Sequence, residues 1–330
     1  MLNETGDLFE MTSLTAALNS STFIPGAAGE LFTDVDGMNT TTAVVDVREG
    51  QITLIDDTAR GAAAQANDGD GTGAPVALLA KHFPVEEIIK PSDFQNIRQL
   101  GDADSLETLE AVRDRKLEIM RKKHALTLEH QRVQALQGKL TNSAGGAVDL
   151  FAAFGGTQIE VAMNLDNDAT RVRSVLLDAI EASEDEVGDI SIDGFVKLCG
   201  KNYWRNFVEH KSVVEAYQRY QDGAALREDM RSGFMLDDVK AVRYRGTVGG
   251  VPLIADDEAY LVPIADLYCT RFAPGDFVET ANTMGLPMYG KARELDYNKG
   301  IGIWTESNPI SFIKKPSAVI KLHRAGIPAG

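Results

Sequence analysis

Apolar and polar residues repeat most regularly, with helical spacing, between Asp104 and Gln137. This stretch contains no glycine and no proline, and Gly101 and Gly138 bracket it. Asp104 with Glu107 three residues later is a capping signal, so we predict one helix of about 50 Å at about 1.5 Å per residue. The apolar stripe is imperfect, which favours a single rigid helix over a long regular coiled coil. Its members are Leu106, Leu109, Val112, Leu117, Met120, Leu126, Leu128, Val133 and Leu136.

Two extended segments precede this helix. Residues 41–56 read as two strands around the turn "REGQ", and "PVALLAKHFPVEEIIKP" returns after them. Three prolines in that second segment exclude a continuous helix. Residues 57–74 between the two segments hold almost no bulky apolar side chain. The pattern predicts a long β-hairpin whose tip has no core of its own and is either mobile or ordered by a neighbour.

The remaining chain mixes helix and strand patterns. Residues 1–40 predict an arm that packs on something else, and 147–163 predict a hairpin around Gly155 and Gly156. An amphipathic helix follows, then a short strand with helices, and from Val239 onward mostly strands. The predicted fold class is therefore α+β. The residues expected to face inward from the amphipathic helix are Val172, Val175, Leu176, Ala179 and Ile180.

Composition and charge narrow the class of protein. The 330 residues are 44% apolar and 25% charged, typical of a globular protein, with a formal charge of −16. Such a charge argues against a sequence-reading nucleic-acid binder. We find no signal peptide and no apolar run long enough to span a membrane. Cys199 and Cys269 are expected to be reduced, packed thiols.

The segment "QANDGDGTGAP", residues 65–75, resembles a calcium loop or a phosphate-binding turn. Counted from Asp68, a calcium loop would need a carboxylate at its twelfth position, where Leu79 stands. Its glycines miss the spacing of a dinucleotide site, and Pro75 and Pro84 exclude the required helix. We interpret the segment as the hairpin tip.

A P-loop-like segment and a pair of histidines also lack residues or spacing that a binding site would need. "GLPMYGKA", residues 285–292, matches a P-loop except that Ala292 replaces the hydroxyl residue that would hold magnesium. His124 and His130 are six residues apart, on different faces of a helix, so we expect surface positions rather than a shared metal. We therefore predict no catalytic, cofactor-binding or metal-binding residues, no cofactor and no enzyme activity.

Several phrases resemble those of one protein family. They are "PVEEIIKPSDFQNIRQLG", "RFAPGDFVETANTMG", "YGKARELDYNKGIGIWTESNPI" and "KPSAVIKL". In number and order they resemble the major capsid proteins of tailed bacteriophages of the lambda type, the capsid protein E family. The resemblance runs from about residue 10 to 324.

The resemblance implies a Hong Kong 97-type capsid fold with an N-terminal arm, an extended loop, a peripheral domain containing the long spine helix, and an axial domain. Many copies would form hexamers and pentamers of an icosahedral shell around double-stranded DNA. The implied segments are 1–40 for the arm, 41–92 for the extended loop, 93–164 for the peripheral domain, 165–265 for the axial domain and 266–330 for strands completing both domains.

The resemblance also implies partners. The arm is short, so a separate scaffolding protein is expected, together with a portal protein, while a decoration protein is left open. The DNA would be enclosed without sequence-specific contact, no membrane is involved, and the protein would be assembled in the host bacterial cytoplasm and end in the virion. Extended loops would clamp neighbouring subunits, and subunits would rotate on maturation. The alternatives are an encapsulin-like nanocompartment shell and an oligomeric α/β enzyme.

Overall fold

The structure is a computed structural model that describes residues 9–20, 26–45, 75–95, 108–141, 147–219 and 234–328. The chain divides into two compact units, each described by itself below. The domain limits predicted from the sequence stay a prediction. The first unit comprises Met1–Ala43, Leu78–Arg132 and Thr270–Ser311, and the second comprises Val44–Ala77, Val133–Cys269 and Phe312–Gly330.

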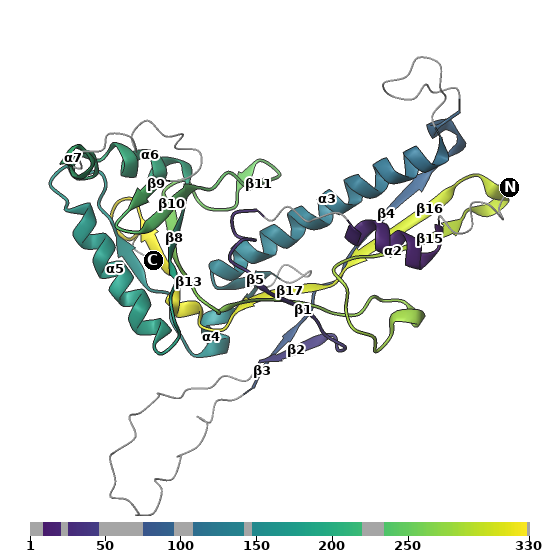
Figure 1. Cartoon of the computed structure of the whole chain (residues 1–330), viewed down its shortest axis with the longest axis horizontal. Coiled ribbons are helices and arrows are strands. Elements are labelled where there is room, and N and C mark those ends of the chain that lie inside the picture. Colours follow the sequence, from purple (N-terminus) through teal and green to yellow (C-terminus); the bar gives the residue numbers. More distant parts are fainter. Residues whose placement is uncertain are drawn as a thin grey trace, which may run out of the picture. The chain divides into compact units, whose positions relative to one another are not determined.

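The predicted long helix is present as α3, Leu109–Leu136 (Figure 1). It ends at Gly138, whose φ of +71° is the left-handed conformation that glycine adopts without strain. The predicted cap at Asp104 lies outside the described residues. Most positions of the predicted stripe are buried, whereas Leu126 is 47% exposed. The long-helix prediction is therefore confirmed, including the irregularity of its apolar face.

The core of the first unit lies between helices and a small antiparallel sheet. The sheet contains β4 (Phe83–Ile89), β15 (Tyr289–Glu294) and β16 (Ile301–Ser307), in the order β15-β16-β4. Helix α2, Met11–Ser20, lies against β15. The buried apolar cluster draws on α2, α3 and the sheet. Its members are Leu14, Leu18, Ile89, Val112, Leu117, Met120, Met288 and Ile303.

Close approach fixes the position of α2. A Cβ atom at Gly290 in β15 would lie 3.0 Å from atoms of both Leu14 and Leu18, a tighter contact than most Cβ atoms make, so glycine favours this close approach of the helix. The Gly290 amide donates to the Thr15 hydroxyl at 3.1 Å, and the Asn19 amide donates to the Met288 carbonyl at 2.9 Å. The predicted arm thus packs on the strands near the C-terminal end of the sequence.

The base of the predicted hairpin is also present. Strand β2, Thr42–Val45, pairs with β3, Val76–Leu79. The rest of the hairpin, including the segment 65–75, lies outside the described residues. The later part of the predicted return segment is β4, which pairs with β16. A further sheet has the order β1-β14-β17, with β1 at Asp34–Gly37, β14 at Tyr268–Phe272 and β17 at Pro309–Ile313.

The second unit is built on a six-stranded sheet in the order β7-β18-β13-β8-β10-β9. Its β8–β10 and β7–β18 pairs are parallel and the others antiparallel. The strands are β7 (Glu160–Ala162), β8 (Gly194–Cys199), β9 (Phe234–Leu236), β10 (Val239–Arg243), β13 (Glu258–Ile264) and β18 (Ile320–His323).

Three helices accompany this sheet. They are α5 (Val172–Val187), α6 (Lys201–Glu209) and α7 (Lys211–Arg219). The predicted inward face of α5 is confirmed. Val172, Leu176 and Ala179 are fully buried, and Val175 and Ile180 pack against the same core cluster.

The hairpin predicted for residues 147–163 is wrong. Strand β6, Ala147–Asp149, leads into the short helix α4, Leu150–Phe154, and β7 pairs with β18 instead. The Asp149 carboxylate accepts hydrogen bonds from the backbone amides of Phe151 and Ala152, and Gly155 ends the helix with a φ of +77°. The glycine pair that suggests a two-residue turn therefore ends a helix.

The described chain contains further short elements. They are β5 (Lys139–Thr141), β11 (Thr247–Val248), β12 (Val251–Pro252) and the 3₁₀ turns η2 (Pro91–Asp93), η4 (Val278–Thr280), η5 (Asp296–Asn298) and η6 (Pro316–Ala318).

A proline at Ile119, in the middle of α3, should break the helix. It removes one backbone hydrogen bond and clashes with the preceding turn, at a cost of about 3 kcal/mol or more in unfolding free energy. The matched control is Ile119→Ala, because this side chain is 49% exposed and alanine favours a helix. Urea unfolding followed by circular dichroism measures both. Equal stability of the two variants would contradict the role given to α3.

Candidate assembly surfaces and the contacts of the long helix

The polar side chains of α3 hold the elements around it. Glu129 is 8% exposed, and its carboxylate accepts hydrogen bonds from the amides of Ala28 and Gly29 at 3.1 and 3.0 Å. A carboxylate is a strong acceptor for such amides, so it fixes the irregular segment that follows α2. The helix thus organises a stretch of chain that has no regular secondary structure of its own.

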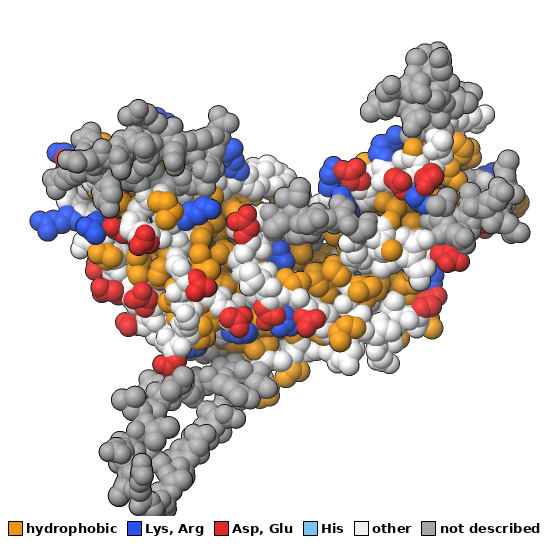
Figure 2. All heavy atoms as spheres, in the orientation of Figure 1, with side chains coloured by type: hydrophobic (Ala, Val, Ile, Leu, Met, Phe, Trp, Pro, Cys, Tyr) orange, Lys and Arg blue, Asp and Glu red, His pale blue; other side chains and the backbone are white. Residues whose placement is uncertain are grey.

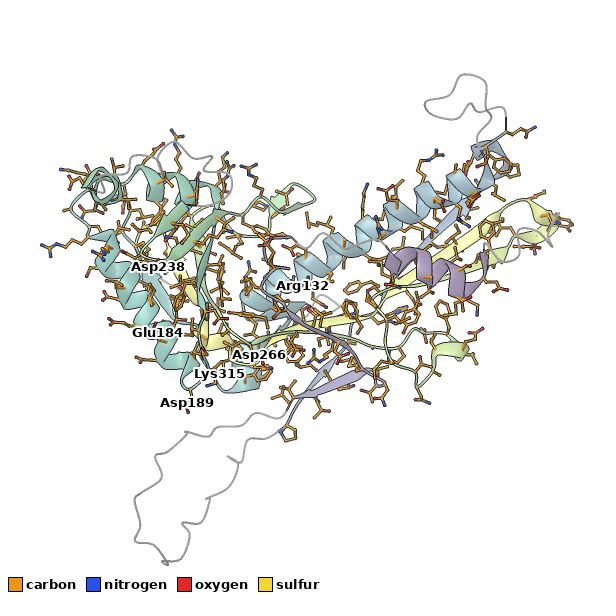
Figure 3. The ribbon with its side chains drawn as sticks, in the orientation of Figure 1. Arg132, Glu184, Asp189, Asp238, Asp266 and Lys315 are labelled. Carbon is orange, nitrogen blue, oxygen red and sulfur yellow. The ribbon has the colours of Figure 1, made fainter. Side chains whose placement is uncertain are left out.

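The next turn of α3 reaches the strands. Arg132 lies with its guanidinium carbon 5.6 Å from the Phe32 ring centre, and its Nε donates to the Thr270 hydroxyl at 3.4 Å (Figure 3). Burial lowers the pKa of Arg132 to about 10, while the nearby Glu129 carboxylate opposes that shift. Gln131 donates to the Pro309 carbonyl at 3.2 Å. These contacts tie β14 and β17 to the helix.

The N-terminal half of α3 holds β4 and the turn after it. The Lys116 amine donates to the Ile88 carbonyl at 2.7 Å and pairs with Glu87 at 3.2 Å and Asp93 at 3.1 Å. The Lys90 backbone amide, and then Lys116, hold the pKa of Asp93 below its usual value. One lysine therefore closes the end of the sheet against the helix.

His124 is buried at 3% exposure, with its Nε2 3.0 Å from the Thr305 hydroxyl of β16. The predicted surface position is wrong for this residue. It lies four residues from both Met120 and Leu128, which are buried, so all three residues share one face of the helix. That spacing could have predicted that His124 is buried. Desolvation lowers its pKa to about 4.

Two of the phrases that carry the family resemblance meet in space. Glu306, from "TESNPI", is 1% exposed, and its carboxylate accepts hydrogen bonds from the Asp276 amide and, at 3.1 Å, the Trp304 indole. The neighbouring Asn308 side chain donates to the Pro274 carbonyl at 2.8 Å. The "APGDF" loop is therefore held by buried polar groups of β16 and the residues after it.

The described residues hold no group of histidine, cysteine and carboxylate side chains that could bind a metal ion. Both cysteines are buried, and burial raises the pKa of the Cys199 thiol to about 12, which disfavours the nucleophilic thiolate form. Gly290 and Lys291 of the P-loop-like segment lie in β15, with the Lys291 amine paired to Glu279 at 2.7 Å. Among the described helices, none is long and apolar enough to span a bilayer.

A groove of about 710 Å³ lies in the second unit. Three of the charged side chains that line it form ion pairs with one another, because the Lys321 amine lies 3.1 Å from Glu258 and 3.9 Å from Glu160. The Tyr260 hydroxyl donates to Glu258 at 3.4 Å. These polar groups stabilise strands β7, β13 and β18 against one another.

The exposed surfaces are the better candidates for function. The outward side of α5 carries five exposed carboxylates, and Figure 2 shows acidic side chains along that side of the second unit. In the first unit, bulky apolar side chains face outward, among them Val278 at 94% and Met284 at 62% exposure. Such groups mark contact surfaces when they gather. The carboxylates of α5 are Asp178, Glu181, Glu184, Asp185 and Glu186.

Comparisons with known proteins point to one class. The family model described as phage major capsid protein E matches residues 10–324. The major capsid protein of Pseudomonas phage KPP10 is 32% identical over 295 residues, covering 81% of this chain and 83% of that protein.

Solved structures agree on the fold. A putative capsid protein of an Escherichia coli CFT073 prophage aligns with a TM-score of 0.64 and 16% identity, over 96% of this chain and 99% of that chain. The mature capsid of bacteriophage PhiM1 gives a TM-score of 0.53 and 14% identity, over 94% and 90% of the two chains.

The fold is therefore that of phage capsid proteins of the Hong Kong 97 type. The chain belongs to the phage major capsid protein E family. This family consists of viral structural proteins and is not an enzyme class.

Replacing Glu129 with alanine should leave the amides of Ala28 and Gly29 without their acceptor. We expect a loss of about 1–3 kcal/mol in unfolding free energy, the cost of unsatisfied buried groups. Urea unfolding midpoints measure the loss. Glu118→Ala on the same helix is the control, because that carboxylate is exposed and pairs with Lys122 at the surface. A control that is destabilised as much as the Glu129 variant would contradict the assigned contact.

His124 should make stability depend on pH. Its pKa is lowered from 6.5 to about 4, so between these values the unfolded chain binds a proton that the folded chain does not. Stability is fully present above pH 6.5 and decreases as the pH falls towards 4, by about 3 kcal/mol in total.

The substitution His124→Gln should remove that part of the acid sensitivity in urea titrations between pH 6.5 and 4. Thr305→Val is the control, since it removes the hydrogen-bond partner but keeps the buried imidazole and its pH dependence. Identical pH profiles for the wild-type protein and the His124 variant would contradict the assignment.

Proposed function

We propose that this protein is the major capsid protein of a tailed bacteriophage. Copies assemble into hexamers and pentamers of an icosahedral shell that encloses double-stranded DNA. The observation that carries the proposal is the family match over residues 10–324, on a fold shared with phage capsid proteins.

The extended loop is the element that clamps neighbouring copies in this proposal. Its described base is the β2–β3 pair, from which residues 46–74 depart and return. That segment has Ile52, Leu54 and Ile55 near its start but almost no bulky apolar residue from 57 onward. A segment of this composition gains order by lying on a second copy, where it supplies one of many modest contacts.

The remaining partners follow from the same proposal. A separate scaffolding protein guides assembly and a portal protein occupies one vertex. Subunits turn as rigid bodies on maturation and remake their loop contacts. The net charge of −16 and the acidic side of α5 favour a shell that holds DNA without binding it tightly.

Deleting Ala59–Thr72 should leave a folded subunit but abolish stable shells, because the shortened loop can no longer contact the neighbouring copy. Sedimentation and electron microscopy of protein expressed with its scaffolding partner measure shell formation. A control variant replaces the same residues with a glycine-serine segment of equal length, which separates the need for length from the need for these side chains. Normal particles from the deletion variant would refute the clamp.

The same preparations test the wider proposal. Closed shells filled by DNA in infected cells support it, whereas shells packed with a protein cargo would indicate a nanocompartment. A small discrete oligomer that never closes would overturn the capsid assignment altogether.

A further inference from the structure

Lys197 lies in the middle of the main core of the second unit. It belongs to β8, is fully buried, and pairs across the sheet with Ala241 of β10 and Leu261 of β13. Its inward neighbours along the strand are Phe195 and Cys199, both members of the apolar cluster. Among the described residues, no atom forms a hydrogen bond with its amine. A buried lysine is ordinarily paired, so this one is exceptional.

The groups around the amine are aromatic rings rather than acids. Its nitrogen lies 3.1 Å from the ring centre of Phe207 and 5.6 Å from that of Tyr203, both in α6. The Tyr203 hydroxyl also finds no hydrogen-bond partner in the described chain. From α5 and α7 the cluster receives apolar side chains such as Leu176 and Val213.

The titratable groups that face Lys197 are therefore few. They are the Tyr203 hydroxyl and the Cys199 thiol, which donates to the Lys197 carbonyl at 3.6 Å. No carboxylate of the described residues forms an ion pair with the amine. Both neighbours are neutral near pH 7, because burial raises the pKa of each.

The two forms of the amine differ in how they fit this site. Burial lowers the pKa of Lys197 from 10.5 to about 8, because the ammonium loses its hydration and gains no oxygen acceptor. The faces of the rings attract a cation and offset part of that loss. The neutral amine is more stable in the apolar surroundings than the charged ammonium is, so protonation of Lys197 destabilises the folded core.

We propose that Lys197 is a proton-controlled weak point of the second unit: the protonated amine keeps the core loosely packed, and loss of the proton tightens it. The inference is independent of the capsid assignment. Between pH 8 and 10.5 the unfolded chain binds a proton that the folded chain has released, so this contribution to stability rises with pH. Below pH 8 the destabilisation is complete and constant.

The substitution Lys197→Met tests the proposal, because methionine has similar length and no charge. The midpoint of thermal unfolding of the soluble subunit is measured at pH 7 and pH 9, along with hydrogen exchange of the α6 amides. We expect the variant to unfold several degrees higher than wild type at pH 7, with slower exchange in α6. The difference in unfolding midpoint between the variant and the wild-type protein should be smaller at pH 9, because the wild-type amine loses its proton.

The control is Lys240→Met on the adjacent strand, where the lysine is exposed and lies opposite Val196 in register. It should leave the midpoint and its pH dependence unchanged. The proposal is overturned if, at pH 7, the Lys197 variant unfolds at the same temperature as the wild-type protein or at a lower one. It is also overturned if the difference in unfolding midpoint is the same at pH 7 and pH 9.

A second measurement on the wild-type chain does not depend on any variant folding. In a subunit labelled with ¹³C at the lysine Cε atoms, one resonance should titrate well below all others. If every lysine resonance titrates above about pH 10, the proposal fails.

Discussion

Taking a charged or polar group out of water is costly unless a partner replaces the lost hydration, and the first unit is organised around that constraint. Glu129, Arg132, His124 and Lys116 are all wholly or largely buried on α3, and each contacts a different segment. A hydrophobic stripe alone would hold those segments near the helix. The polar partners decide which atom meets which, and so fix one arrangement.

That specificity suits a protein that must be the same in every copy of a shell. The "APGDF" loop shows it well, since it has no helix or strand to define it and depends on Glu306 and Asn308. Two of the phrases that carry the family resemblance therefore meet through buried hydrogen bonds within the subunit.

The sequence predicts the elements whose signal is local. Helices α3 and α5 follow from periodicity and from the absence of glycine and proline, and the β2–β3 base follows from strand composition. The hairpin predicted at 147–163 is wrong because a glycine pair ends a helix as readily as it makes a turn. Asp149 also caps the N-terminus of α4, which favours a helix where the sequence pattern predicted a strand. The partners of Glu129 and His124 lie a hundred residues or more away along the chain, and no periodicity identifies such pairs. Lys197 keeps the alternation of a buried strand but has the wrong residue type for it.

The way α2 covers β15 has a consequence for a protein made in many copies. Strand β15 stands at the end of its sheet, and a bare edge of this kind is a template for pairing with any other chain. Thr15 and Asn19 engage backbone groups beside that edge, while Leu14 and Leu18 lie over Gly290. Because α2 occupies this position, its side chains fill space and use a backbone amide that another chain would otherwise need in order to pair with β15.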